Sequence, residues 1–127
     1  MATPALAWVP GRYAVCRLDP GHGLPVWCVH SEPILAMMRT PDELTIVCEE
    51  RLVPAEVRAE RGFSALRVAG TIDFSATGVL SSIAGPLAGQ GVSVFALSTY
   101  DTDYLLVRAV EADRTARTLS AAGFAIS

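Results

Sequence analysis

The stretch "GVSVFALSTYDTDYLLVRAVEAD" (Gly91–Asp113) decides the fold, because two apolar runs flank a short polar centre, Ser98–Asp103. Apolar runs bounded by polar turn residues predict a strand on either side, over residues 92–98 and 104–110. The polar centre has two interpretations. It is either a hairpin turn whose aspartates fix their own backbone, or a ligand site at the edge of a sheet. The residues alone leave both open.

Two helices are predicted around this hairpin. Apolar residues recur at i, i+3, i+4 and i+7 in the first helix, which gives it one buried face. That face consists of Leu80, Ile83, Ala84 and Leu87. Asp73 or Ser75 is the predicted N-cap, and Pro86 predicts a bend or a restart. Residues 112–122 form the second helix, followed by a last short strand over residues 124–126.

The first half of the chain shows weaker signals. Strands are predicted at residues 13–18, 34–39, 44–48 and 63–68, with a turn at residues 40–43. Residues 1–11 are predicted to be a frayed or lightly docked tail, and the Pro/Gly-rich segment 19–33 to be irregular. Residues 54–61 are predicted to be a short helix that stops at Gly62.

An internal repeat organises these elements. Met38–Val47 and Leu97–Val107 both read as strand, threonine, aspartate-bearing turn and strand. A helix, a Gly-Phe pair and a further strand follow each copy, which gives the order βαββαβ. We therefore predict an α+β fold of two ferredoxin-like units in tandem, the first degenerate, with antiparallel sheets and helices on one face. The predicted division is a tail (1–11), a degenerate unit (12–70) and a second unit (63–127) that share a strand near 63–70.

The overall composition excludes several classes of protein. Of 127 residues, 51% are hydrophobic and 18% charged, which is enough apolar material for a folded core. The net charge is −3 and the chain contains no lysine, so no basic stripe is available for nucleic acid. No apolar run is long enough for a membrane helix, and the N-terminus does not resemble a secretory signal. Three cysteines without a CxxC motif predict reduced thiols in a cytoplasmic protein.

Catalytic and metal sites are also disfavoured. His22, Cys28 and His30 offer zinc-type ligands, but their spacing matches no common zinc pattern and no fourth ligand is evident. No Cys/His or Ser/His pairing is suggested by the sequence, and the two histidines of one Pro/Gly-rich loop are a thin basis for catalysis. We therefore expect no catalytic residue, no metal and no cofactor, and we expect the chain not to be an enzyme.

One stretch carries a family resemblance, "DFSATGVLSSIAGPLAGQGVSVFALSTYDTDYLLV" (Asp73–Val107). It resembles ACT domains, which are small amino-acid-binding regulatory modules. It is most similar to bacterial tandem-ACT proteins related to the aspartokinase regulatory region and to the cellular arginine sensors of animals. The resemblance implies a regulatory binding module that holds an amino acid or a derivative at an interface between ACT units, in a homodimer or with a regulated partner protein.

The resemblance also implies which residues face the ligand. They lie at a helix start and in a strand-end loop: Thr77, Gly78, Val79, Ser98, Thr99, Tyr100 and Asp103. Free amide groups at a helix start favour a carboxylate, and Asp103 is suited to an ammonium or another cationic group. Thr99 offers a hydroxyl, and Tyr100 offers a ring to cover an aliphatic part. Gly78 has a second explanation, which is close packing of helix and sheet.

A second function fits the same sequence. The chain is then a protein–protein interaction domain whose ligand site is vestigial, and it joins another chain through an exposed strand edge or a helix face. A response to amino acids separates the two functions.

Overall fold

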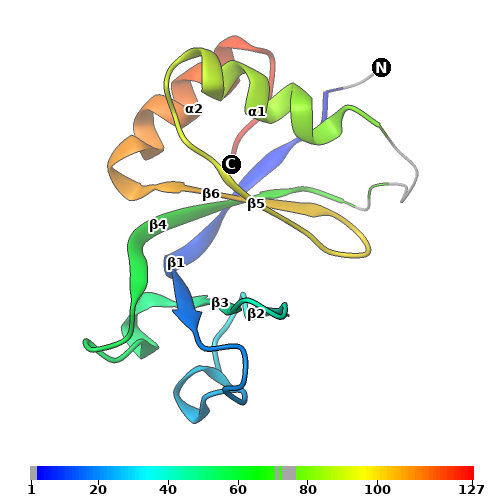
Figure 1. Ribbon diagram of the computed structural model, residues 1–127. Helices are drawn as coiled ribbons and strands as arrows, with labels where there is room; N and C mark the ends of the chain where they lie inside the picture. Colours follow the sequence, from blue (N-terminus) through cyan, green and yellow to red (C-terminus); the bar gives the residue numbers. More distant parts are fainter. Residues whose placement is uncertain (1–2, 71, 73–76) are drawn as a thin grey trace. The chain divides into compact units, whose positions relative to one another are not determined.

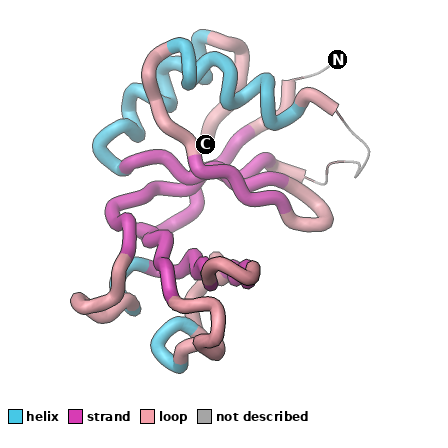
Figure 2. The backbone as a smooth tube through the Cα atoms, viewed as in Figure 1, coloured by secondary structure: helices cyan, strands magenta, loops and turns pink. Residues whose placement is uncertain are grey.

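The computed structural model describes residues 3–70, 72 and 77–127. The protein is a mixed α/β structure with antiparallel strands and few helices (Figures 1 and 2). In chain order the elements are β1 (Leu6–Leu18), the 3₁₀ helix η1 (Val26–Cys28), β2 (Ala36–Arg39), β3 (Leu44–Glu49), η2 (Glu50–Leu52), β4 (Ala59–Val68), α1 (Val79–Gly89), β5 (Phe95–Ser98), β6 (Asp103–Arg108), η3 (Ala109–Glu111) and α2 (Ala112–Ala121).

The chain divides into two compact units. The first comprises the residues up to Val9 together with Ser64–Ser127, and the second comprises Pro10–Phe63. Hydrogen-bonded strands follow one another in the order β2-β3-β1-β4-β6-β5. Strands β1 and β4 each contain residues of both units. The chain therefore passes from one unit to the other within a strand and not through a linker.

The first unit has the order β4-α1-β5-β6-α2 and ends in a short segment that bridges to β1 at Leu6 and Ile126. In Figure 1, α1 and α2 lie on the same side of β4, β5 and β6. Buried residues from the strands and both helices meet there as one core cluster, named core 1: Leu6, Leu66, Val68, Ile83, Leu87, Val92, Leu105, Val107, Leu119 and Phe124. This arrangement is the predicted ferredoxin-like βαββαβ fold.

The second unit is built from β2, β3 and the adjoining parts of β1 and β4. Strand β3 pairs antiparallel with β1, from Tyr13↔Glu49 to Leu18↔Leu44, and with β2 on its other side. Alternate residues of β1 and β3 point into a second core cluster, named core 2: Ala14, Cys16, Cys28, Leu44, Ile46, Cys48 and Val53. Between residues 10 and 63 the connections contain 3₁₀ turns and no α-helix.

The prediction of an N-terminal tail over residues 1–11 is wrong from Leu6 onward. Strand β1 begins at Leu6, which is only 1% exposed, and runs on through Pro10 and Gly11. The sequence did not reveal this because the pairing partner is remote. The amide of Leu6 donates to the carbonyl of Ala125, and the amide of Ser127 donates to Leu6. These bonds satisfy backbone groups that an isolated terminus leaves to water.

The helix predicted over residues 54–61 is also absent. This segment forms a turn that enters β4 at Ala59, and the amide of Arg17 in β1 donates to the carbonyl of Arg58. The guanidinium of Arg61 donates to the carbonyls of Val53, Pro54 and Val57, which holds the segment in its turn. Pairing with β1 thus overrode a weak helix propensity.

The other predicted strands and helices occur with shifted ends, except that the strand predicted over residues 124–126 is reduced to a single bridge between Ile126 and Leu6. Helix α1 is continuous from Val79 to Gly89 and contains Pro86, so the predicted restart does not occur. The N-cap residue is Gly78, whereas Asp73 and Ser75, the N-caps suggested by the sequence, lie outside the described residues. Among the described residues, no helix is long and apolar enough to cross a membrane.

Candidate functional site

The polar centre Ser98–Asp103 forms the tip of the β5–β6 hairpin. Ser98 and Asp103 are the last directly opposed residues of the two strands, so their side chains lie on the same face. The Ser98 hydroxyl donates to Oδ1 of Asp103 at 2.7 Å. The turn between them closes by a bond from the Thr99 amide to the Thr102 carbonyl at 2.8 Å. The segment therefore forms a hairpin whose turn is closed by Thr99 and Thr102, and a hairpin of this kind is compatible with a ligand site at its tip.

The hairpin tip is fixed to the rest of the first unit at two points. Thr102 is 4% exposed, and its hydroxyl donates to the carbonyl of Val68 at the end of β4, at 2.8 Å. The amide of Ile72 donates to the carbonyl of Asp101 at 2.6 Å. A turn held by its own bonds and by two external ones is a rigid platform for the side chains that it carries.

The second component is the start of helix α1. Gly78 adopts φ +79° as the N-cap residue, a left-handed conformation that residues with a side chain rarely adopt. Because Gly78 has no side chain, it cannot cap the helix itself, and the amides of the first turn have no acceptor within the helix. They carry the positive end of the helix dipole. The helix start is therefore suited to an anionic group.

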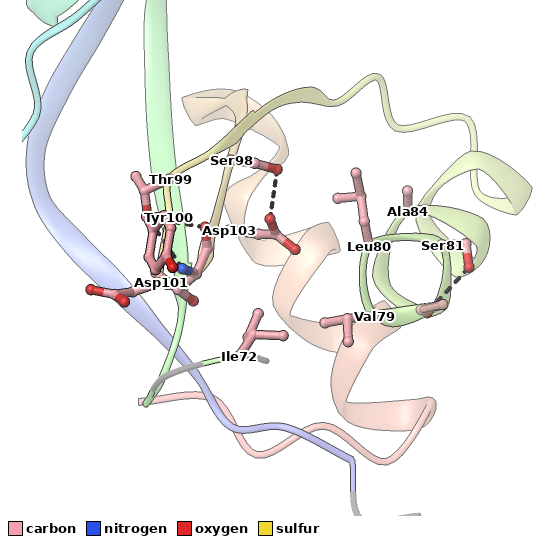
Figure 3. A pocket seen from close by; sticks show the side chains of 12 residues that line it. Ile72, Val79, Leu80, Ser81, Ala84, Ser98, Thr99, Tyr100, Asp101 and Asp103 are labelled. Carbon is pink, nitrogen blue, oxygen red and sulfur yellow. Dashed lines mark hydrogen bonds between the residues drawn. The ribbon is translucent and has the colours of Figure 1, made fainter. Parts of the chain in front are cut away.

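These two components border one cavity of about 620 Å³, within the size range of small-molecule sites. It lies within the first unit, between the hairpin tip and the start of α1 (Figure 3). The lining residues are Ile72, Gly78, Val79, Leu80, Ser81, Ala84, Ser98, Thr99, Tyr100, Asp101, Thr102 and Asp103.

Of the two carboxylates among the described lining residues, one faces the cavity. In Figure 3 the carboxylate of Asp103 faces the space between the hairpin and α1, whereas the side chain of Asp101 points away from it. No arginine, lysine or histidine is among the described residues of the lining. One inward carboxylate thus faces the amide-rich start of a helix, so the cavity offers complementary places for a cation and an anion.

Six of the seven site residues expected from the sequence line this cavity: Gly78, Val79, Ser98, Thr99, Tyr100 and Asp103. Thr77 is exposed and is not part of the lining. Sequence reasoning did not name six of the lining residues as individual site residues, although it assigned Leu80 and Ala84 to a buried helix face: Ile72, Leu80, Ser81, Ala84, Asp101 and Thr102. Helical spacing offered a signal for two of them, because Ser81 and Ala84 lie three to four residues from Gly78 or Leu80 and share a helix face with them.

The residues weighed as zinc ligands are not arranged as a site. His22 and His30 are exposed, whereas Cys28 is buried and its thiol donates to the carbonyl of Pro25. Burial raises the pKa of the Cys28 thiol. A hydrogen bond with Cys16, together with burial, raises the pKa of Cys48. The neutral, buried thiols of Cys28 and Cys48 pack as apolar core groups, since thiolates are the reactive form.

Comparison with known proteins identifies the family. A family model for the ACT domain matches residues 58–121, half of the chain. The chain belongs to the ACT-domain family. A second family model, described as an N-terminal domain, matches residues 11–56. The ACT match covers β4, α1, β5, β6 and α2, and therefore the whole described cavity.

Individual relatives agree with this assignment. Human CASTOR3P is 35% identical over 85 residues, which span 57% of this chain and 52% of that protein. An X-ray structure of a protein from Agobacterium tumefaciens is 33% identical, with a TM-score of 0.93 over 100% of this chain and 94% of that one. The regulatory subunit of aspartate kinase from Thermus thermophilus shares the fold at 10% identity, with a TM-score of 0.63 over 96% and 99% of the two chains. Membership of this family supports a regulatory small-molecule-binding module.

Proposed function

We propose that this chain is a regulatory ACT module that binds a free amino acid or a derivative and has no catalytic activity of its own. The observation that carries the proposal is the cavity in which Asp103 faces the start of helix α1. The α-carboxylate lies at the amides following Gly78, and the α-ammonium lies at Asp103. Thr99 and Tyr100 border the same space from the hairpin.

The hydrogen bonding and partial burial of Asp103 support its assignment as the group that binds the ammonium. Oδ1 accepts a hydrogen bond from Ser98, which sets the orientation of the carboxylate, and a carboxylate has further acceptor capacity at Oδ2. A charge-assisted bond to a half-buried carboxylate contributes more than a neutral one. Asp103 therefore favours a cationic group.

A panel of amino acids tests the proposal by thermal shift on the intact chain. A ligand that binds only the folded state at a hundred times its Kd stabilises the protein by about 2.7 kcal/mol. Asp103→Asn is expected to weaken binding roughly 10- to 100-fold, the equivalent of losing one charged hydrogen bond. Asp101→Asn is the matched control, since it removes the same charge from the same hairpin at a side chain that points away from the cavity.

The possible outcomes distinguish a specific ammonium site from a general effect of charge and from the absence of amino-acid binding. Retained binding in Asp101→Asn with loss in Asp103→Asn supports the assignment. Equal loss in both variants contradicts a specific ammonium site. Amines without a carboxylate, and carboxylic acids without an amine, are expected to bind more weakly than the amino acid because each fills only half of the site. A folded protein that responds to no amino acid contradicts the proposed function.

The wider organisation is also proposed. We take residues 12–70 to be a degenerate ACT unit in tandem with the unit over 63–127, because β1, β2, β3 and β4 follow the same order with 3₁₀ turns in place of both helices. The module works as a homodimer or with a regulated partner protein, and it binds neither nucleic acid nor membranes. The three buried free cysteines favour a reducing, cytoplasmic setting.

A pure interaction domain is the second candidate. Strand β2 ends the order of strands, and its residues Met37 and Met38 are 48% and 68% exposed. An exposed apolar edge strand is available for pairing with another chain. Capture of one stable protein partner that is unaffected by Asp103→Asn, together with silence in the amino-acid panel, favours this candidate.

A further inference from the structure

The interior of the cavity has a third surface besides the carboxylate and the helix start. Ile72, Val79 and Leu80 line the cavity, and Figure 3 shows their side chains around the space that Asp103 faces. All three are half-buried and pack against core 1. Their positions are therefore set by the core, which makes them a fixed apolar surface.

The remainder of the described lining is mostly polar, but several of its hydroxyls already donate hydrogen bonds, as Ser98 does to Asp103. The hydroxyl of Ser81 already donates to the carbonyl of Gly78, and Thr99 and Thr102 bond within the hairpin or to β4. Asp103 and the helix start are engaged by the ammonium and carboxylate of the proposed ligand. No charged group of this lining is left to pair with an ionised ligand side chain, since Asp101 points outward.

From these observations we propose that the ligand is an amino acid with an uncharged aliphatic side chain, which packs on Ile72, Val79 and Leu80. This inference rests on the proposed function and specifies its ligand class. An aliphatic side chain loses contact with water on this surface, whereas a charged one loses hydration without gaining a partner. Binding is therefore expected to strengthen with aliphatic length until the cavity is filled.

A homologous series tests this directly by calorimetry on the full chain. Alanine, 2-aminobutyrate and norvaline add one methylene at a time. Affinity is expected to rise about two- to fourfold at each step, because part of each methylene is buried. Glutamate and lysine are expected to bind more weakly than norvaline, since their charged ends have no partner in the described lining.

Val79→Thr supplies the matched variant, because threonine has nearly the shape of valine but brings a hydroxyl to the apolar surface. It is expected to reduce norvaline affinity two- to fivefold and to reduce alanine affinity by a smaller factor. Val94→Thr is the control, because Val94 also packs half-buried against core 1 but does not line the cavity. This control separates a change of ligand preference from a general loss of core packing.

Equal affinities across the series, or tightest binding by a charged amino acid, overturn the aliphatic inference and leave the proposed function standing. The absence of binding by every amino acid overturns both. A rising series whose slope is reduced in Val79→Thr and retained in Val94→Thr supports the inference.

Discussion

Gly78 illustrates how one residue's backbone shapes the site. Its φ of +79° turns the chain into helix α1 at the edge of the cavity. Among the described residues, a Cβ at this position meets no atom closer than the Ser81 hydroxyl at 4.0 Å, so these residues leave space for a side chain. The backbone conformation of Gly78 disfavours a side chain, because the left-handed region brings a Cβ too close to the backbone. Gly78 is thus required by its conformation and not by close packing.

Gly78→Ala is therefore expected to destabilise the protein by about 1–2 kcal/mol. Gly85→Ala, within the same helix, is expected to change the stability much less, because Gly85 has no left-handed φ and no described atom lies within 4 Å of its Cβ, while the gain in helix propensity is offset by the restriction that Pro86 places on the residue before it. Thermal unfolding of both variants checks the prediction. Similar effects at the two positions contradict it.

Glu49, in the second unit, couples the protonation of one carboxyl group to the stability of the protein. Its carboxylate accepts the amide of Glu32 at 3.0 Å and the guanidinium of Arg51 at 2.9 Å, and these bonds lower the pKa of Glu49. A depressed folded pKa contributes stability above the unfolded pKa, near 4.3, and this contribution is lost as the pH falls through the folded value.

Glu49→Gln is accordingly expected to lower stability at pH 7 and to lessen its decline between about pH 5 and pH 3. Urea unfolding across this range measures the effect. The two proteins are expected to converge in stability once the carboxyl of the wild type is protonated. A constant difference at every pH contradicts the linkage.

At the scale of elements, the β5–β6 hairpin and helix α1 reach the cavity from separate parts of the first unit. The hairpin's position depends on Thr102, whose hydroxyl donates a hydrogen bond to the carbonyl of Val68 at the end of β4. Without this bond the hairpin keeps its own turn bonds but loses one anchor to β4. Positioning of Asp103 thus depends on contacts outside its own strand.

Thr102→Val is expected to destabilise the protein by about 1–3 kcal/mol, because it leaves a buried carbonyl without a donor. Thr102→Ser keeps the hydroxyl and is expected to cost about 0.8 kcal/mol or less, the value of one buried methyl group. Chemical denaturation of the two variants compares them. A serine variant as unstable as the valine one contradicts the role of the hydrogen bond.

At the scale of the whole molecule, the two units cannot be separated by cutting a linker. Strands β1 and β4 carry residues of both, and each unit has its own core cluster. Unfolding of one unit leaves the other with the free ends of these two continuous strands. We therefore expect one cooperative transition.

Each unit contains its own fluorescent reporter. Trp8 packs against core 1 and Trp27 against core 2. In Trp27→Phe only Trp8 reports, and in Trp8→Phe only Trp27 reports. The expected result is that each reporter's urea midpoint coincides with that of the far-ultraviolet circular dichroism of the same variant. Two separated transitions within one variant contradict the shared-strand argument.

The sequence by itself determined the second half of this protein. Helical spacing placed α1 and α2, and the apolar runs around Ser98–Asp103 placed β5 and β6, because these signals are local in the chain. The same local order gave the ferredoxin-like fold. The resemblance to ACT domains then singled out the two segments, near Gly78 and near Asp103, that border the cavity.

Only the tertiary structure decided the rest. Strand β1 extends to Leu6 because the C-terminal residues pair with it, and residues 54–61 form a turn because Arg17 and Arg61 bond to them. The apolar surface of the cavity likewise joins Ile72 to Val79 and Leu80 through core 1. These features depend on backbone and side-chain partners that are distant in sequence, whereas periodicity reports only which residues of one element share a face.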